Sequence, residues 1–119
     1  MSDLTRKNIN GNEYLFINSF RGNYSGFVHE TELYKNDRFI GENKIQYYNR
    51  TWECYTYQSV MKGLVYDLME NYIEDYKDTW KNTHGIKRLT EAKRKEMMEH
   101  FESNTPEEYA ELKELYAML

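Results

Sequence analysis

The chain has one cysteine, Cys54, and one proline among its 119 residues. A single cysteine excludes an intramolecular disulfide framework, which favours a reducing compartment. No apolar run approaches the ~20 residues of a membrane-spanning helix. The first residues, MSDLTRKN, lack the apolar segment of a secretory signal. We therefore expect a cytoplasmic protein without a membrane anchor.

Reaction chemistry is also sparse. The glycines form no phosphate-binding loop, and the three histidines lack metal-ligand spacing. Glu96 and His100 stand four residues apart, but two ligands do not make a metal site. Cys54 has no sequence signature that supplies a base, so we interpret it as a structural cysteine. The pattern predicts neither an enzyme nor a bound cofactor.

Tyrosine is abundant: the chain has twelve, while apolar residues make up 39%. A chain of this length is expected to form a single domain, residues 1–119. Its core must be built partly from tyrosine, whose hydroxyl groups need polar partners or water.

The residue pattern in the first half of the chain predicts β-strands. Residues 1–12 are polar and are expected to be loose. Residues 13–20 are rich in strand formers, residues 27–34 alternate between two faces, and residues 38–48 give a third strand with a bulge at Gly41. We expect a three-stranded antiparallel meander over residues 13–48.

The second half predicts one long helix and two shorter ones. Apolar residues at helical spacing span residues 51–81, and His84-Gly85 is a plausible end. Tyr48 and Trp52 are assigned to the junction between strand and helix. Within residues 90–119, Thr90 is expected to cap a helix reaching Phe101.

The last helix has a start signal of its own. Thr105 is expected to be its N-cap, followed by a first-turn Pro106 and a capping-box Glu108. The apolar stripe of this helix comprises Tyr109, Leu112, Tyr116 and Leu119. It is expected to pack on the chain's own sheet, although a homodimer stays possible. The predicted class is α+β, with the helices on one face of the sheet.

Charge is divided along the chain. Residues 51–82 carry a net −3 and residues 102–119 a net −4, on either side of a basic stretch of net +2. On the long helix, four acidic residues fall within an arc of ~80° around the helix, on the side away from its apolar residues, and form an acidic stripe. It consists of Asp67, Glu70, Glu74 and Asp78. The last helix repeats the pattern with Glu107, Glu111 and Glu114.

The basic stretch holds Lys87, Arg88, Lys93, Arg94 and Lys95. Five cations with acidic neighbours would bind nucleic acid weakly at physiological salt. Direct nucleic-acid binding is therefore not the first expectation. It remains an alternative, as a small nucleic-acid-binding regulatory protein of a phage or mobile element. A small-molecule binder or enzyme with a tyrosine-lined pocket is a further alternative.

Residues 47–61, YYNRTWECYTYQSVM, carry a resemblance. They resemble a strand-to-helix segment in small proteins of phages and mobile elements of Gram-positive bacteria. Several such proteins are anti-CRISPR inhibitors of the type II-A effector nuclease (Cas9-type). The resemblance implies a stoichiometric inhibitor that occludes a positively charged nucleic-acid channel. The charge pattern then suggests the acidic stripe as the contact surface, with Tyr66 on its flank as an aromatic anchor.

Overall fold

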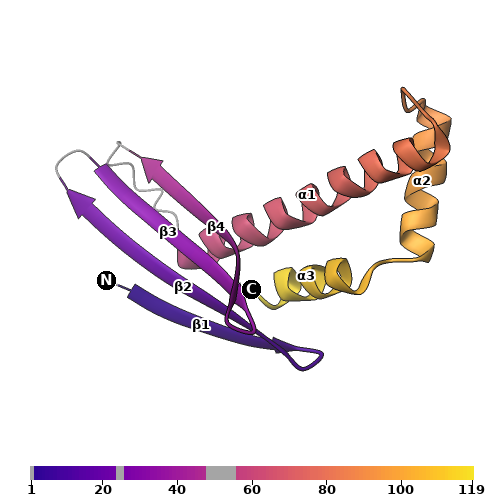
Figure 1. Cartoon of the computed structure of the whole chain (residues 1–119). Helices are drawn as coiled ribbons and strands as arrows, with labels where there is room; N and C mark the ends of the chain where they lie inside the picture. Colours follow the sequence, from indigo (N-terminus) through magenta and orange to yellow (C-terminus); the bar gives the residue numbers. More distant parts are fainter. Residues whose placement is uncertain (1, 24–25, 48–55) are drawn as a thin grey trace.

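The computed structural model describes residues 2–23, 26–47 and 56–119. Within them, four antiparallel strands precede three helices, and the strand order in the sheet equals the order in the chain (Figure 1). The predicted α+β class is confirmed, with one strand more than expected. The elements are β1 Ser2–Ile9, β2 Asn12–Asn23, β3 Gly26–Lys35, β4 Arg38–Tyr47, α1 Tyr57–His84, α2 Glu91–Ser103 and α3 Glu107–Met118.

The additional strand is β1, so the prediction of a loose N-terminal segment was wrong. β1 pairs with β2 from Ser2 opposite Ser19 to Ile9 opposite Asn12. The connection is Asn10-Gly11, with φ of 52° and 82°. Positive φ at both positions is typical of a type I′ turn, whose twist matches that of the strands it joins.

One face of the sheet is buried. Alternate residues of β2 and β3 point to it, and His29, Thr31 and Leu33 confirm the alternation predicted for residues 27–34. The predicted bulge is also present, because Leu33 pairs with Gly41 while Tyr34 pairs with Phe39. A side chain at Gly41 would begin 3.2 Å from Leu68 Cδ2. Glycine there lets α1 cross close to β4.

The long helix begins later than predicted. Thr56 is its N-cap and forms a reciprocal capping box with Ser59. The predictions for residues 51–55, including Cys54 and Trp52, and for Tyr48 lie outside the described residues. The end at Gly85 is confirmed, with φ of 64°. The helix therefore extends three residues past the predicted limit at Lys81.

The caps of the two shorter helices differ. Thr90 caps α2 as predicted, since its Oγ1 accepts a hydrogen bond from the Lys93 amide. The predicted cap of α3 was wrong: Pro106 occupies the N-cap position, without a side-chain hydrogen bond. The Thr105 hydroxyl instead donates to the carbonyls of Phe101 and Glu102. It is used to close α2, not to start α3.

The core lies between the inner sheet face, the first half of α1, and α3. It consists of Ile9, Tyr14, Phe16, Leu33, Met61, Leu64, Val65 and Leu115. Leu112 and Leu119 of the predicted stripe pack against it, but Tyr116 is 38% exposed. Leu115 takes the inward place, so α3 is rotated by about one residue relative to the prediction. Its apolar face packs on the chain's own core.

The molecule is elongated. Its radius of gyration is 17.6 Å, whereas a compact chain of this length would give about 13.5 Å. The excess arises because α1 continues beyond the sheet and carries α2 at its far end (Figure 1). We call residues 72–103 the arm. Within the arm, Met97 and Phe101 of α2 are buried apart from the main core.

The position of Leu115 generates a stability prediction. Leu115→Ala removes a fully buried side chain and should lower the free energy of unfolding by ~2–5 kcal/mol. Leu4→Ala, at a site that is 53% exposed, should cost less than ~1 kcal/mol. Urea unfolding followed by circular dichroism measures both changes. Equal losses would contradict this packing of α3.

Candidate functional site

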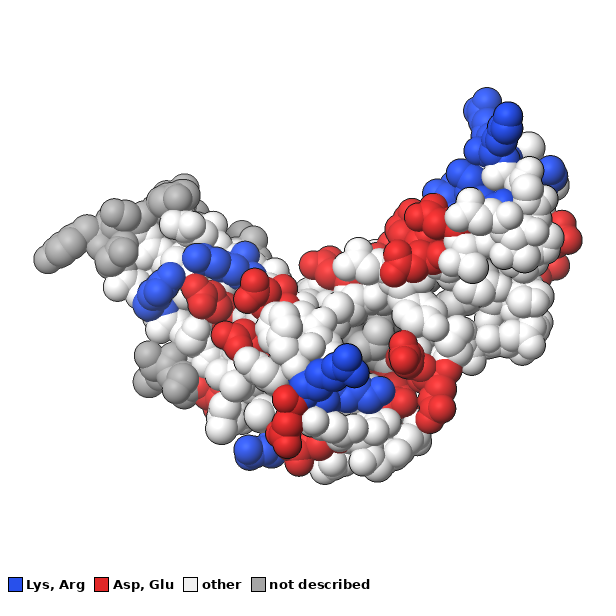
Figure 2. Space-filling view, in the orientation of Figure 1, with Lys and Arg blue, Asp and Glu red and all other residues white. Residues whose placement is uncertain are grey.

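The acidic stripe lies on the solvent side of α1. Asp67, Glu70, Glu74 and Asp78 are all exposed. Lys77 Nζ lies 3.8 Å from Glu74 Oε2, and among the described residues the other three carboxylates form no ion pair. Tyr66, on the flank of the stripe, is 53% exposed. Figure 2 shows acidic side chains gathered along the projecting helix.

The stripe is accessible because of how α1 is divided. Its buried residues, Val60, Met61, Leu64 and Val65, all lie in the part over the sheet. Leu68 and Met69 still pack against the core, and further along the helix is supported by aromatic contacts such as that of Tyr76 with Phe101. Glu74 and Asp78 therefore stand on the arm, where a second molecule can approach from solvent.

Aromatic side chains hold α2 against α1. Phe101 contacts Tyr76 and Tyr109 edge to face, with ring centroids 4.9 Å apart in each case. The Tyr76 hydroxyl lies 2.5 Å from His100 Nδ1, and Trp80 stacks on His84 at 4.0 Å. His100 is thus engaged with tyrosine. Within the described residues, no three His, Cys, Asp or Glu side chains are placed to hold a metal ion.

The basic residues cluster at the outer end of the arm. Lys87, Arg88, Lys93, Arg94 and Lys95 are all exposed, and Figure 2 shows basic side chains projecting there. The acidic stripe and the basic cluster therefore occupy separate parts of the molecule. Because the basic cluster lies apart from the acidic stripe, it does not neutralise the charge of the stripe.

A groove lies beside the stripe, between the β3–β4 hairpin, α1 and α3. It has a volume of about 600 Å³ and is open to solvent. Its apolar surface is formed by Tyr14, Ile40, Leu68, Tyr72 and Leu112. Sequence reasoning did not find it, because its walls come from segments far apart in the chain. The tyrosine content was the available signal.

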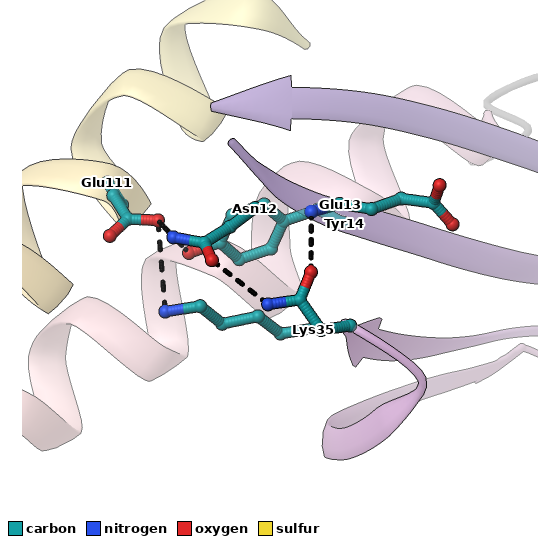
Figure 3. A network of polar contacts seen from close by, with 6 residues as sticks. Asn12, Glu13, Tyr14, Lys35 and Glu111 are labelled. Atoms are coloured by element: carbon teal, nitrogen blue, oxygen red, sulfur yellow. Dashed lines mark hydrogen bonds and ion pairs between the residues drawn. The ribbon is translucent and has the colours of Figure 1, made fainter. Parts of the chain in front are cut away.

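Glu111, the neighbour of the groove residue Leu112, corrects a prediction. It was expected on an exposed acidic face, yet it is only 2% exposed. Its Oε1 accepts hydrogen bonds from Asn12 Nδ2 at 2.7 Å and from the Tyr14 hydroxyl at 3.0 Å, and it lies 3.7 Å from Lys35 Nζ (Figure 3). Such partners compensate the desolvation of a buried carboxylate. The second acidic face is thus reduced to Glu107 and Glu114.

The same network perturbs Tyr14. Burial, the hydrogen bond to Glu111 and the negative charge of that carboxylate together raise the pKa of the Tyr14 phenol well above its usual range. Lys35 also lies 5.6 Å from the centre of the Tyr14 ring. The phenol therefore stays neutral at physiological pH and acts as a hydrogen-bond donor.

The described helices include none that is long and apolar enough to cross a membrane. Comparison with known proteins finds no matching protein-family model, curated protein or solved structure. The relation to phage inhibitors that residues 47–61 suggested stays a prediction.

The Glu111 network generates a second stability prediction. Glu111→Gln removes the charge that Lys35 faces and replaces one acceptor oxygen with a donor. We expect a loss of ~1–3 kcal/mol in the free energy of unfolding. Glu114→Gln, an exposed neighbour on the same helix, should change it by less than ~0.5 kcal/mol. Chemical unfolding of both variants at pH 7 measures these changes. Similar losses in the free energy of unfolding for the two variants would mean that the buried carboxylate is not stabilising.

Tyr14 generates a prediction on pH. A pKa raised in the folded state means that the folded chain holds this proton more tightly, so its contribution is complete below about pH 10 and is lost as pH rises further. Between pH 9 and 11 the wild type should therefore lose more stability than Tyr14→Phe. Tyr66→Phe, which removes an exposed hydroxyl, should follow the wild type. Urea unfolding across this pH range tests it, and parallel curves for wild type and Tyr14→Phe would contradict it.

Proposed function

We propose that this protein is a stoichiometric inhibitor of a bacterial defence nuclease, and that its acidic stripe occupies a basic nucleic-acid channel of that nuclease. The observation that carries the proposal is the exposed row of carboxylates on a helix that projects from the body. The resemblance of residues 47–61 to phage proteins supports the choice of the type II-A effector as target. Binding, and not catalysis, is the proposed activity.

The spacing of the charges supports this mode of binding. From Asp67 to Asp78 the helix advances by eleven residues, which is ~16 Å along its axis. A nucleic-acid strand presents one negative charge per ~3.4 Å. A channel built for a guide–target duplex is lined by cations that follow such a charged backbone. The stripe offers a shorter row of negative charge that can meet part of this lining.

Electrostatics would also favour rapid encounter. An acidic surface is steered towards a basic channel, which raises the association rate more than the final affinity. Affinity then needs an apolar anchor, and exposed aromatic residues commonly provide one. Tyr66 stands beside Asp67 on the solvent side of α1 and is the proposed anchor.

The basic cluster at the end of the arm favours one alternative, a nucleic-acid-binding regulator. Its five cations are all exposed, so contact with a phosphate backbone is sterically open. Retention on DNA with a steep dependence on salt would favour this alternative over the inhibitor. Weak retention that is insensitive to changes in Lys87 and Arg88 would argue against it.

A DNA-cleavage assay tests the inhibitor proposal. Purified type II-A effector with its guide RNA is mixed with increasing protein, and we expect cleavage to stop near a one-to-one ratio. The double variant Asp67→Lys with Glu74→Lys should need at least about tenfold more protein, which corresponds to about 1.4 kcal/mol.

The matched control is Glu99→Lys with Glu102→Lys, which makes the same change in net charge at exposed sites on α2. It should inhibit like the wild type. Full inhibition by the stripe variant, with an unchanged circular dichroism spectrum, would remove the stripe from the mechanism. Unaffected cleavage with excess wild-type protein would remove this nuclease as the target.

A further inference from the structure

The groove between the β3–β4 hairpin, α1 and α3 has opposite charges on its two sides. Lys35 and Arg38 line it from the hairpin. Asp75 of α1 and Glu108 of α3 line it from the helices. The apolar surface formed by Tyr14, Ile40, Leu68, Tyr72 and Leu112 lies between them. The groove therefore combines an apolar centre with a cationic and an anionic side.

The cationic side is held in place before any ligand arrives. The turn between β3 and β4 is fastened to β2 by Asn36, whose Nδ2 donates to Asn12 Oδ1 at 2.9 Å and whose Oδ1 accepts from the Glu13 amide at 2.9 Å. The Asn36 amide donates to the Glu13 carbonyl at 2.8 Å. A turn fixed at three points loses little further entropy when it binds a ligand.

Arg38 is the available cation of this side. Lys35 is already turned towards Glu111, at 3.7 Å, and is about one quarter exposed. Arg38 is exposed and forms no ion pair with any described residue. Its planar guanidinium suits a carboxylate, which it can bind through two parallel hydrogen bonds.

The carboxylates of the anionic side are available to a ligand in the same way as Arg38. Asp75 and Glu108 are both exposed, and neither forms an ion pair with any described residue. They come from different helices and converge on the groove. Glu108 lines the groove together with Tyr14 and Tyr72, and its negative charge contributes to the raised pKa of both phenols.

We infer that the groove binds a peptide segment of a partner protein, in which an apolar or aromatic residue lies between an acidic and a basic residue. The acidic residue would meet Arg38, and the basic residue would meet Asp75 and Glu108. A peptide fits better than a free small molecule because the groove is open, whereas small-molecule sites enclose most of their ligand. The inference is independent of the proposed inhibitor function, which uses the acidic stripe.

A displayed peptide library provides the probe. Random twelve-residue peptides on phage are selected against the immobilised full chain, and the affinities of enriched peptides are measured by fluorescence anisotropy. We expect enriched peptides with the acidic–apolar–basic pattern. Arg38→Glu and Asp75→Lys should each weaken their binding about tenfold or more. Arg88→Glu at the end of the arm and Glu99→Lys on α2 are the matched controls, at exposed sites that do not line the groove, and should leave it within about twofold.

A charge exchange makes the test specific to the groove. In the double variant Arg38→Glu with Asp75→Lys, a peptide whose acidic and basic residues are exchanged should bind more tightly than the original peptide. The inference is overturned if no peptide is enriched, if binding survives both groove variants, or if Glu99→Lys abolishes it. None of these results bears on nuclease inhibition, which is read from the stripe variants.

Discussion

The buried carboxylate of Glu111 is the interaction on which the arrangement of this protein depends. One oxygen, Oε1, accepts hydrogen bonds from the side chains of Asn12 and Tyr14 on β2 and lies near the ammonium group of Lys35 at the end of β3. It therefore joins α3 to two hairpins that lie about a hundred and about seventy-five residues earlier in the chain. A buried charge without such partners would be strongly unfavourable, so the carboxylate admits few alternative placements of α3. With α3 fixed, Leu115 enters the core and Leu112 completes the groove.

The molecule is divided into a body that supplies stability and an arm that supplies surface. The body contains the sheet, the first half of α1 and α3, and it buries the main core. The arm is held by stacked and edge-to-face aromatic side chains together with Met97 and Phe101. Residues on the outside of the arm have no packing role, so their charges can be set by solubility and binding alone. This explains how α1 carries a row of like charges that repel one another at helical spacing.

Periodicity predicted what depends on local pattern. It gave β2, β3, β4, the bulge, and the buried and exposed sides of α1, because an alternating or helical stripe reports directly on burial. It missed β1, whose inward side includes the polar Asp3, Thr5 and Lys7. The Asn10-Gly11 turn was the signal that could have revealed this strand. Glu111 and Thr105 were misjudged for a different reason. The partners of Glu111 come from β2 and β3, so no local rule identifies them. Thr105 lies between two helices, and its hydroxyl bonds back to the end of α2 instead of forward to the start of α3.

The groove and the acidic stripe occupy neighbouring sides of α1, so the two surfaces share one electric field. Asp75 lines the groove, while Glu74 and Asp78 belong to the stripe within the same turn and the next. A helix is ~10–12 Å across, and the screening length at physiological salt is ~8 Å. Charges on the two sides are therefore only partly screened from each other. A cationic partner on the stripe would lower the attraction of the groove for the basic residue of a peptide, while favouring the acidic residue at Arg38. Charge alone would then couple the two sites, without a change in the fold.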